Sequence, residues 1–320
     1  MKTRLFVVAL TIMGAASMSY GEEVDLKYKM AREYMVREHV SVTVKARGTD
    51  LDSAGNFKKP LKADMSSTFG QEAILVVGEG APKKGSTGGQ RRLTAIRAAE
   101  VVAQRALAEM LKGVSIVGET MVRDAELESD VIKSSVGTFI KGFVPVLKEW
   151  NAREETAIVI LKVGMTGPKS FGALMYENML KEPKIQKVLD VPVFVPPADV
   201  APPMPSSQPY DGLIIDATAY AFRPALINRI FNPNGEVLYD PAKISQKVLV
   251  EQGCGEYTNT VDKARAALGK RGVRNPLIVR ASGTVSASDL QVSKDVSLQI
   301  FTANQGTGFM ADARVAFVLK

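Results

Sequence analysis

The sequence is poor in the residues that most often carry out chemistry in proteins. Its 320 residues include one cysteine, Cys254, and one histidine, His39. A single thiol excludes an intramolecular disulfide, and isolated His and Cys residues do not form the ligand clusters that hold zinc. No nucleophile, base and orienting group accompanies His39 in the pattern that Ser–His or Cys–His catalysis needs. We therefore predict no catalytic, cofactor-binding or metal-binding residues and no enzyme activity.

Two further candidates for chemistry have simpler interpretations. Cys254 lies between Gly253 and Gly255, so it is either a reactive or intermolecular thiol or a small residue in a turn, and we favour the turn. Glu154 and Glu155 form a carboxylate pair. We expect this pair in a hairpin turn, where the carboxylates are solvated and have no acid–base partner. The role of Cys254 stays open at this point.

The sequence also lacks a charge-free apolar run of the roughly 20 residues that span a bilayer. The apolar run at 5–13 is shorter, follows Lys2 and Arg4, and leads to small or neutral residues up to Gly21. Because this is the order of a secretory signal, we expect residues 1–21 to be cleaved and the mature protein to be periplasmic or outer-membrane-associated. No Cys lies at the cleavage point, so we expect no lipobox and no lipid anchor.

The sequence has no excess of acidic residues, and its formal net charge is +7. The expected signal peptide contains Lys2 and Arg4, so 39 of the 41 basic residues remain against 34 acidic ones, a net charge of +5. This mild excess suits an acidic partner, peptidoglycan or lipopolysaccharide, and a solvated exterior explains it equally well. No dense Lys/Arg run occurs in this exported sequence, so we expect no nucleic-acid partner.

Two loops come close to known ligand-binding motifs without matching them. Residues 80–87 have two glycines at the spacing of a phosphate-binding loop, but no Lys follows the second glycine, and Pro82 removes a backbone donor. Asp50 and Asp52 lie in a loop at 48–63 that lacks the Glu at the twelfth position of an EF-hand. We therefore interpret 80–87 as a flexible connection and predict neither nucleotide nor calcium binding.

Hydrophobic periodicity predicts the elements of the N-terminal half. In order, they are a helix at 22–38, a strand at 40–45, the loop at 48–63, a buried strand at 73–77, a long helix at 87–112, an extended segment at 114–122, an acidic loop at 124–128, a helix at 130–141, and a hairpin of strands at 144–150 and 156–163. This order implies helices laid on one face of a mostly antiparallel sheet.

The long helix is the best specified of these elements. Thr87 and Gln90 fit a capping box at its start, and Gly113 fits its end. One face is apolar and the other is charged. The small residues Ala99 and Ala103 on the apolar face would let the helix approach a sheet closely. The charged face is either solvated or a partner-binding surface, and we favour solvation.

Short motifs within residues 73–163 resemble a known family. They are Arg97-Ala98-Ala99-Glu100, Ala106-Leu107-Ala108-Glu109, Lys112-Gly113-Val114, Gly118-Glu119-Thr120, Ser129-Asp130-Val131-Ile132 and Gly137-Thr138-Phe139-Ile140-Lys141-Gly142. Together they resemble bacterial envelope lipoproteins of the LPP-twenty type, and the N-terminal domain of the flagellar assembly protein FlgT is similar. The resemblance implies an α+β fold and a place in the cell envelope. The missing lipobox Cys departs from the lipoprotein members.

A proline-rich segment separates this half from a second one. A charged helix interrupted at Pro183 is predicted within 170–189, and seven prolines between 192 and 209 favour an extended, semi-rigid spacer, with a docking peptide as the alternative. The second half is predicted to contain strands at 213–219, 275–281 and 313–319, a turn at 232–235, and helices at 260–268 and within 288–298. Its motifs Tyr210-Asp211-Gly212-Leu213, Arg223-Pro224-Ala225-Leu226 and Asn275-Pro276-Leu277-Ile278 resemble domains found beside the first in the same group.

The predicted architecture is α+β, with two domains that each have a mostly antiparallel or mixed sheet and helices packed on one face. We divide the chain into a signal peptide (1–21), a helix, strand and loop (22–72), an LPP-twenty/FlgT-like domain (73–167), a charged helix with a Pro-rich linker (168–209), and a C-terminal domain (210–320). The expected function is non-catalytic support of assembly or anchoring, with envelope or flagellar basal-structure proteins as partners. The alternative is binding of an anionic envelope polymer, either peptidoglycan or lipopolysaccharide at the outer-membrane surface.

Overall fold

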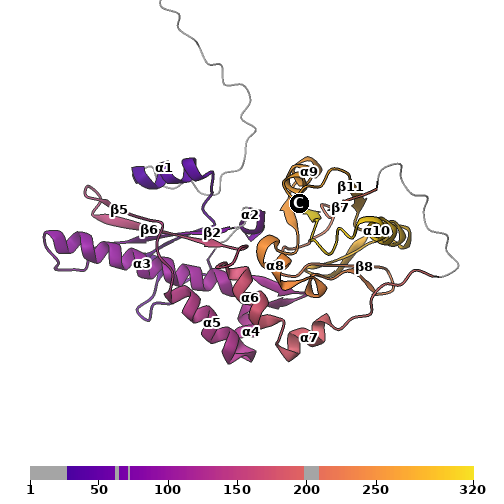
Figure 1. Ribbon diagram of the computed structural model, residues 1–320. Helices are drawn as coiled ribbons and strands as arrows, with labels where there is room; N and C mark the ends of the chain where they lie inside the picture. Colours follow the sequence, from indigo (N-terminus) through magenta and orange to yellow (C-terminus); the bar gives the residue numbers. More distant parts are fainter. Residues whose placement is uncertain (1–26, 62–64, 71–72, 198–208) are drawn as a thin grey trace, which may run out of the picture.

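The computed structural model describes residues 27–61, 65–70, 73–197 and 209–320 (Figure 1). The predicted signal peptide and the middle of the Pro-rich segment lie outside the described residues. Helices and strands alternate along the chain and form two adjoining regions, an N-terminal region up to residue 189 and a C-terminal region from residue 209. The predicted α+β class is confirmed.

A four-stranded mixed sheet forms the centre of the N-terminal region. Its strands are β1 (Val44–Arg47), β2 (Ala73–Gly80), β6 (Thr156–Gly164) and β5 (Leu147–Asn151), in that spatial order. Strands β2 and β6 pair antiparallel, as do β6 and β5, whereas β1 joins β2 in parallel. The predicted hairpin of β5 and β6 is confirmed. Strand β2 is fully buried along its length because helices cover both of its faces.

Helix α3 (Gly89–Lys112) lies along one face of this sheet (Figure 1). Its approach is close because two glycines of β2, Gly78 and Gly80, face the helix. A Cβ atom on either glycine would overlap the backbone of Ala99, which agrees with the predicted role of small residues on this helix face. The predicted capping box was wrong. The N-cap residue is Gly88, which has a φ of 51°, and no side chain forms a capping hydrogen bond there. The predicted end at Gly113 is confirmed.

Helix α1 (Lys29–Glu38) covers the opposite face of the sheet, so the helices are not restricted to one face (Figure 1). Its buried side chains pack on Leu75, Val77, Ile158 and Ile160, which form a separate apolar cluster. The carboxylate of Glu149 on β5 accepts hydrogen bonds from the backbone N–H groups of Met30 (3.2 Å) and Ala31 (2.9 Å). A side chain distant in sequence therefore caps this helix, which the local sequence could not indicate.

Between α3 and β5 the chain forms a small hairpin and two helices. They are β3 (Ser115–Val117), β4 (Thr120–Met121), α4 (Val122–Glu128) and α5 (Asp130–Lys141). The predicted extended segment is thus a hairpin that turns at Gly118, where φ is +61°. The predicted acidic loop was wrong, because α4 occupies it. Helix α5 and its cap are confirmed, since the Ser129 hydroxyl accepts from the Ile132 N–H.

Two short helices lead toward the C-terminal region. They are α6 (Phe171–Met179) and α7 (Pro183–Leu189), and the predicted interruption at Pro183 is the first residue of α7. The described first residues of the Pro-rich segment, 192–197, pack against the C-terminal region. The Phe194 N–H donates to the Val237 carbonyl (3.0 Å), and the Val237 N–H donates to the Pro192 carbonyl (2.8 Å). The ring of Phe194 also meets Phe301 edge-on.

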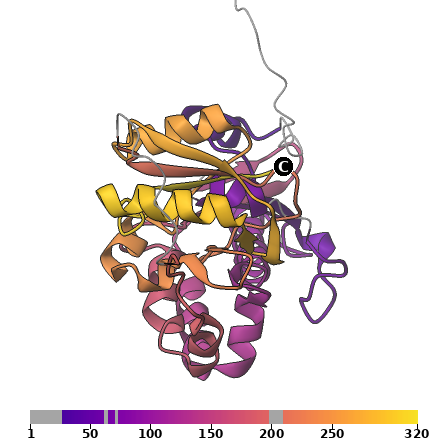
Figure 2. The same cartoon turned by 90° about the vertical axis from the view of Figure 1, so that its right-hand side faces the viewer.

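The C-terminal region contains a four-stranded sheet in which every pairing is parallel. Its strands are β10 (Glu256–Thr258), β14 (Val315–Val318), β7 (Gly212–Asp216) and β11 (Pro276–Arg280), in that spatial order. Helix α9 (Val261–Lys270) packs on Ile214, Ala316 and Val318. The other face joins the main core, which includes Ile300 of α10 (Lys294–Thr307). Figure 2 shows α9 and α10 on opposite sides of the sheet.

A second, mixed sheet joins this region to the docked Pro-rich segment. Its strands are β12 (Gly283–Ser286), β13 (Asp289–Gln291), β8 (Arg229–Phe231) and β9 (Val237–Tyr239). The predicted turn between β8 and β9 is confirmed. The helix predicted within 288–298 begins later, at Lys294, because β13 occupies the first residues. Helices α2 (Met65–Gly70) and α8 (Gln246–Gln252) were not predicted.

One apolar core runs through both regions. It contains buried residues of β2, α3, α6, β7, β8 and α10 in a single cluster. Apolar burial is the main stabilising contribution to folding. Because this core is continuous, each region contributes to the stability of the other. Within the described residues, none of the helices has the length and apolar character needed to cross a membrane.

Candidate functional site

The most developed polar site is the junction where the β3–β4 hairpin of the N-terminal region enters the C-terminal region. The Leu226 N–H donates to the Ser115 carbonyl (3.0 Å), and the Ile227 N–H donates to the Ile116 carbonyl (2.8 Å). These bonds join β3 to the segment that precedes β8. The hairpin therefore contacts the C-terminal region through backbone hydrogen bonds, which depend little on side-chain identity.

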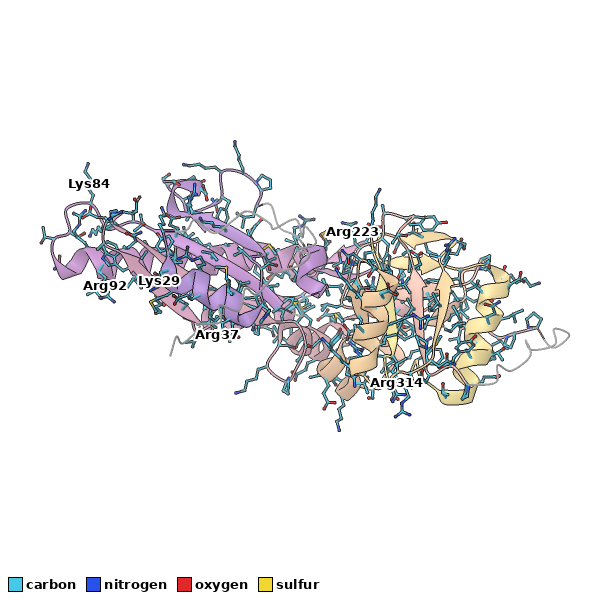
Figure 3. The ribbon with its side chains drawn as sticks, turned by 90° about the horizontal axis from the view of Figure 1, so that it is seen from above. Lys29, Arg37, Lys84, Arg92, Arg223 and Arg314 are labelled. Carbon is cyan, nitrogen blue, oxygen red and sulfur yellow. The ribbon has the colours of Figure 1, made fainter. Side chains whose placement is uncertain are left out.

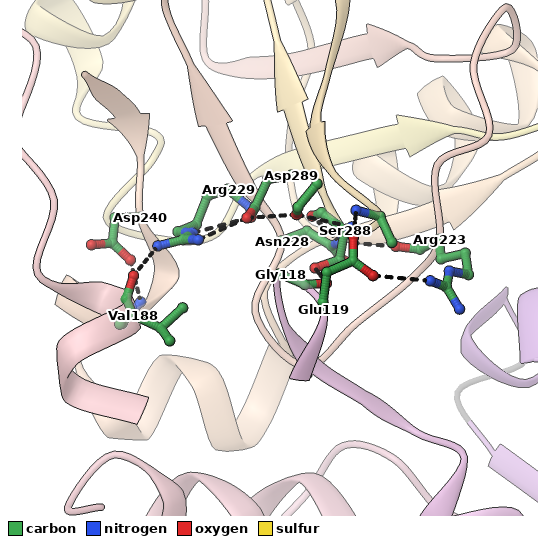
Figure 4. Close-up of polar contacts among 12 residues, drawn as sticks. Gly118, Glu119, Val188, Arg223, Asn228, Arg229, Asp240, Ser288 and Asp289 are labelled. Atoms are coloured by element: carbon green, nitrogen blue, oxygen red, sulfur yellow. Dashed lines mark hydrogen bonds and ion pairs between the residues drawn. The ribbon is translucent and has the colours of Figure 1, made fainter. Parts of the chain in front are cut away.

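The tip of this hairpin is held by the loop around Ser288 (Figure 4). The Ser288 hydroxyl donates to the Gly118 carbonyl (3.0 Å), and the Ala287 N–H donates to one carboxylate oxygen of Glu119 (2.7 Å). The other oxygen pairs with Arg223 at 3.5 Å. Since Glu119 and Arg223 are largely exposed, this ion pair contributes little. The bonds to Gly118 and Ala287 define the docked position.

Asn228 is the hub of the junction, and its side chain uses its full hydrogen-bonding capacity. It is fully buried. Its amide nitrogen donates to the carbonyls of Arg223 (3.0 Å) and Ser288 (2.6 Å). Its oxygen accepts from the Ala225 N–H (2.8 Å) and from the Tyr257 hydroxyl. One side chain thus joins three segments, the loop at 223–228, Tyr257 and Ser288. Buried polar groups satisfied in this way specify a single arrangement.

Arg229, the next residue, forms a buried ion pair with Asp289. Its Nε donates to Oδ1 (3.0 Å) and its Nη2 donates to Oδ2 (2.7 Å) of the carboxylate, which is the bidentate geometry. The remaining Nη1 donates to the Val188 carbonyl at the end of α7 (2.8 Å). Ser286 donates a further bond to Asp289 (2.8 Å). Arg229 therefore ties α7 to the second sheet of the C-terminal region (Figure 4).

Cys254 lies beside the same junction in a narrow cavity between the two regions. The cavity has a volume of about 30 Å³ and is lined by Met165 and Tyr176 from one region and by Cys254, Tyr257 and Arg271 from the other. The Cys254 Sγ lies 3.0 Å from the Tyr257 hydroxyl. Burial raises the pKa of the Cys254 thiol and raises the pKa of Tyr257 well above its usual value. Both groups are therefore neutral, and the thiol is a structural one in a turn.

The other residues singled out from the sequence lie away from this junction. His39 is the exposed, left-handed residue that ends α1. Glu155 is exposed in the β5–β6 turn and pairs with Arg91. Asp50 and Asp52 accept backbone N–H groups of Arg47 and Asn56. No cluster of three or more potential metal ligands occurs within the residues that the structure describes.

Two of the sequence motifs meet at the junction, although their meeting was not predicted. Gly118-Glu119-Thr120 and Arg223-Pro224-Ala225-Leu226 are in contact through Glu119 and Arg223. Asn228 and Asp289 were missed altogether. Their role depends on partners far away in sequence, and neither a local repeat nor a hydrophobic period marks them.

The geometry defines the site as a polar junction that joins two α+β regions. Residues 212–320 match the family model described as the second domain of Treponema pallidum Tp0624. The match covers all strands of the parallel sheet and of the second sheet, about a third of the chain, and begins two residues after the predicted boundary at Tyr210. The comparison with curated proteins finds no match.

Proposed function

We propose that the protein is an exported, non-catalytic envelope protein that supports assembly or anchoring in association with the flagellar basal structure. The resemblance to LPP-twenty-type and FlgT-like proteins motivates the location and the partners, and periplasmic or outer-membrane-associated proteins of that structure are the partners we expect. The junction carries the argument for a supporting role. The backbone bonds of Leu226 and Ile227 to β3, and the bond from the buried Arg229 to the Val188 carbonyl of α7, hold the two regions in one orientation, which a structural component requires.

The similarity to a second domain of another protein supports the same proposal. The matched segment, residues 212–320, is described in Treponema pallidum Tp0624 as one domain among others. In the present chain the matched segment is joined to the N-terminal region through β3 and α7. A domain that is attached to another part of its chain in this way suits a role in contacts between proteins.

Deletion of the gene, followed by cell fractionation, swimming assays and imaging of basal structures, tests this function. We expect the protein in the periplasmic or outer-membrane fraction, co-purification with basal-structure proteins, and impaired swimming after deletion. Complementation with the wild-type chain should restore swimming, and complementation with Asn228→Leu should not. Intact basal structures and normal swimming after deletion would exclude the flagellar role.

A second candidate function is binding of an anionic envelope surface or polymer, which one observation favours. Residues 81–97 contain five cations, Lys83, Lys84, Arg91, Arg92 and Arg97, and no acidic residue. Figure 3 shows two of them, Lys84 and Arg92, at the end of the N-terminal region that is distant from the C-terminal region. We call this group the cationic end. Sedimentation with isolated peptidoglycan or lipopolysaccharide at low and high salt tests the candidate function.

A further inference from the structure

The cationic end has an excess of free positive charge. Lys83, Lys84 and Arg92 are exposed, and within the described part of the chain none of them has a salt-bridge partner. Arg91 pairs with Glu155, and Arg97 pairs with Glu100. Charge neutralisation inside the protein is therefore incomplete at this end. The three unpaired cations remain available to an external anion.

These cations are spread across the end of the molecule. Figure 3 shows Lys84 and Arg92 extending to different sides of the end that is farthest from the C-terminal region. One small anion cannot contact side chains that point to different sides. A flat surface that carries many negative groups can contact all of them at once. The arrangement therefore favours an extended anionic surface over a single small ligand.

An apolar side chain lies among the cations. Leu93 follows Arg92 directly, one helical turn before Arg97, and is 67% exposed. Long basic side chains beside an exposed apolar one form the pattern of proteins that bind at the interface of a membrane, where the cations meet phosphate groups and the apolar residue enters the acyl boundary. A soluble or carbohydrate polymer would not provide a favourable environment for Leu93.

We propose that the cationic end binds a phosphate-bearing lipid surface through Lys83, Lys84 and Arg92, with Leu93 inserted at the interface. This inference deepens the second candidate function and rests on it, and it is independent of the flagellar association. The bound molecule stands with its N-terminal region toward the lipid and its C-terminal region away from it. No residue of the junction takes part in the contact.

The test is co-sedimentation of the full-length protein with vesicles. One set contains an anionic phospholipid in a zwitterionic background, and the other contains only the zwitterionic lipid. We expect binding to the anionic set alone, and weaker binding when salt is raised from about 0.1 M to about 1 M, because the Debye length falls from about 10 Å to about 3 Å. Equal binding to both sets, or no binding at the lower salt, would overturn the proposal.

Two triple variants with the same change in net charge locate the contact. Each Lys or Arg near an anionic membrane contributes about a fivefold gain in affinity, so Lys83→Gln/Lys84→Gln/Arg92→Gln should weaken binding roughly 100-fold. The matched control, Lys247→Gln/Lys270→Gln/Arg265→Gln, removes two Lys and one Arg that are exposed on α8 and α9. The control should keep its affinity within a few-fold. Equal losses in both variants would show general charge attraction and overturn the assignment.

Leu93→Gln separates a lipid surface from other phosphate-bearing partners. Loss of an inserted Leu side chain should weaken vesicle binding by about tenfold or more. All variants are checked for unchanged circular dichroism and melting temperature, and since the seven substituted residues are exposed we expect no loss of fold. Unchanged vesicle binding by Leu93→Gln would contradict insertion. Binding to peptidoglycan in preference to anionic vesicles would contradict the lipid assignment while leaving the second candidate function intact.

Discussion

Arg229 donates two parallel hydrogen bonds to the carboxylate of Asp289, and the two side chains are only 5% and 1% exposed. Removal of one partner from such a pair leaves an uncompensated buried charge. Replacement of both partners by apolar residues of similar size is often tolerated. The pair therefore contributes mainly to the specificity of the junction, because only one arrangement of α7 and β13 satisfies both side chains.

The first prediction concerns this ion pair. Arg229→Met should lower the free energy of unfolding by about 3–5 kcal/mol, and the double variant Arg229→Met/Asp289→Leu should lose less than the single one. Arg314→Met provides the control, since the Arg314–Asp312 pair is partly exposed and worth less than about 1 kcal/mol. Urea denaturation measures all three. A double variant as unstable as the single one would contradict the account of an uncompensated charge.

The second prediction concerns the close contact between β2 and α3. Gly78→Val places a branched side chain into the backbone of α3, so we expect a loss of at least about 3 kcal/mol, at the upper end for overpacked cores. Gly137→Ala in α5 is the matched control, because a Cβ there meets no atom within 4 Å. That substitution should stabilise the protein by up to about 1 kcal/mol. Thermal unfolding distinguishes the two outcomes.

The third prediction is a pH dependence at Glu100. Hydrogen bonding from Lys148, with a further contribution from Arg97, lowers the pKa of the Glu100 carboxylate. A lowered folded-state pKa gives stability that is present above the unfolded pKa and is lost as the pH falls through the folded pKa. Lys148→Gln should therefore be less stable than wild type by about 0.5 kcal/mol at neutral pH, a small value because Lys148 is 44% exposed.

At a pH below the folded-state pKa of Glu100, the stability difference between wild type and Lys148→Gln should disappear. Denaturation curves of both proteins across the acidic range measure it. The control variant Lys187→Gln, at an exposed lysine of α7, should show the same dependence of stability on pH as wild type. A difference that persists unchanged in acid would exclude the Glu100–Lys148 bond as its cause.

The fourth prediction concerns the thiol of Cys254. Because the side chain is 2% exposed and burial raises its pKa, a disulfide reagent should modify the native protein at least about 100-fold more slowly than the urea-unfolded chain. The absorbance of the released thiolate measures both rates. Fast modification of the native protein would instead identify Cys254 as an accessible, reactive thiol, which was the less favoured interpretation of the sequence.

Local patterns predicted most individual elements of this fold. The helix at 130–141, the β5–β6 hairpin, the break at Pro183 and the strands β7, β11 and β14 all have caps, turns or apolar runs of their own. The prediction at 124–128 failed because its acidic residues suggested a solvated loop. In the structure, Val122 and Ala125 of α4 are buried against the core and stabilise a helix there.

The arrangement between elements was much harder to predict. The wholly parallel sheet of the C-terminal region depends on crossovers between strands that are far apart in sequence, for which a strand pattern gives no register. The cap of α1 by Glu149 and the hub at Asn228 likewise join residues more than 50 positions apart. Glu and Asn side chains are usually exposed, so the sequence alone does not indicate that Glu149 caps a distant helix or that Asn228 is buried.

Helix α3 also fixes a distance. It is one uninterrupted helix of 24 residues, and at 1.5 Å per residue its length is about 36 Å. It begins beside Lys83 and Lys84 and ends directly before the hairpin that enters the C-terminal region. The helix is therefore a spacer of set length, which holds the C-terminal region at a constant stand-off from whatever the cationic end contacts.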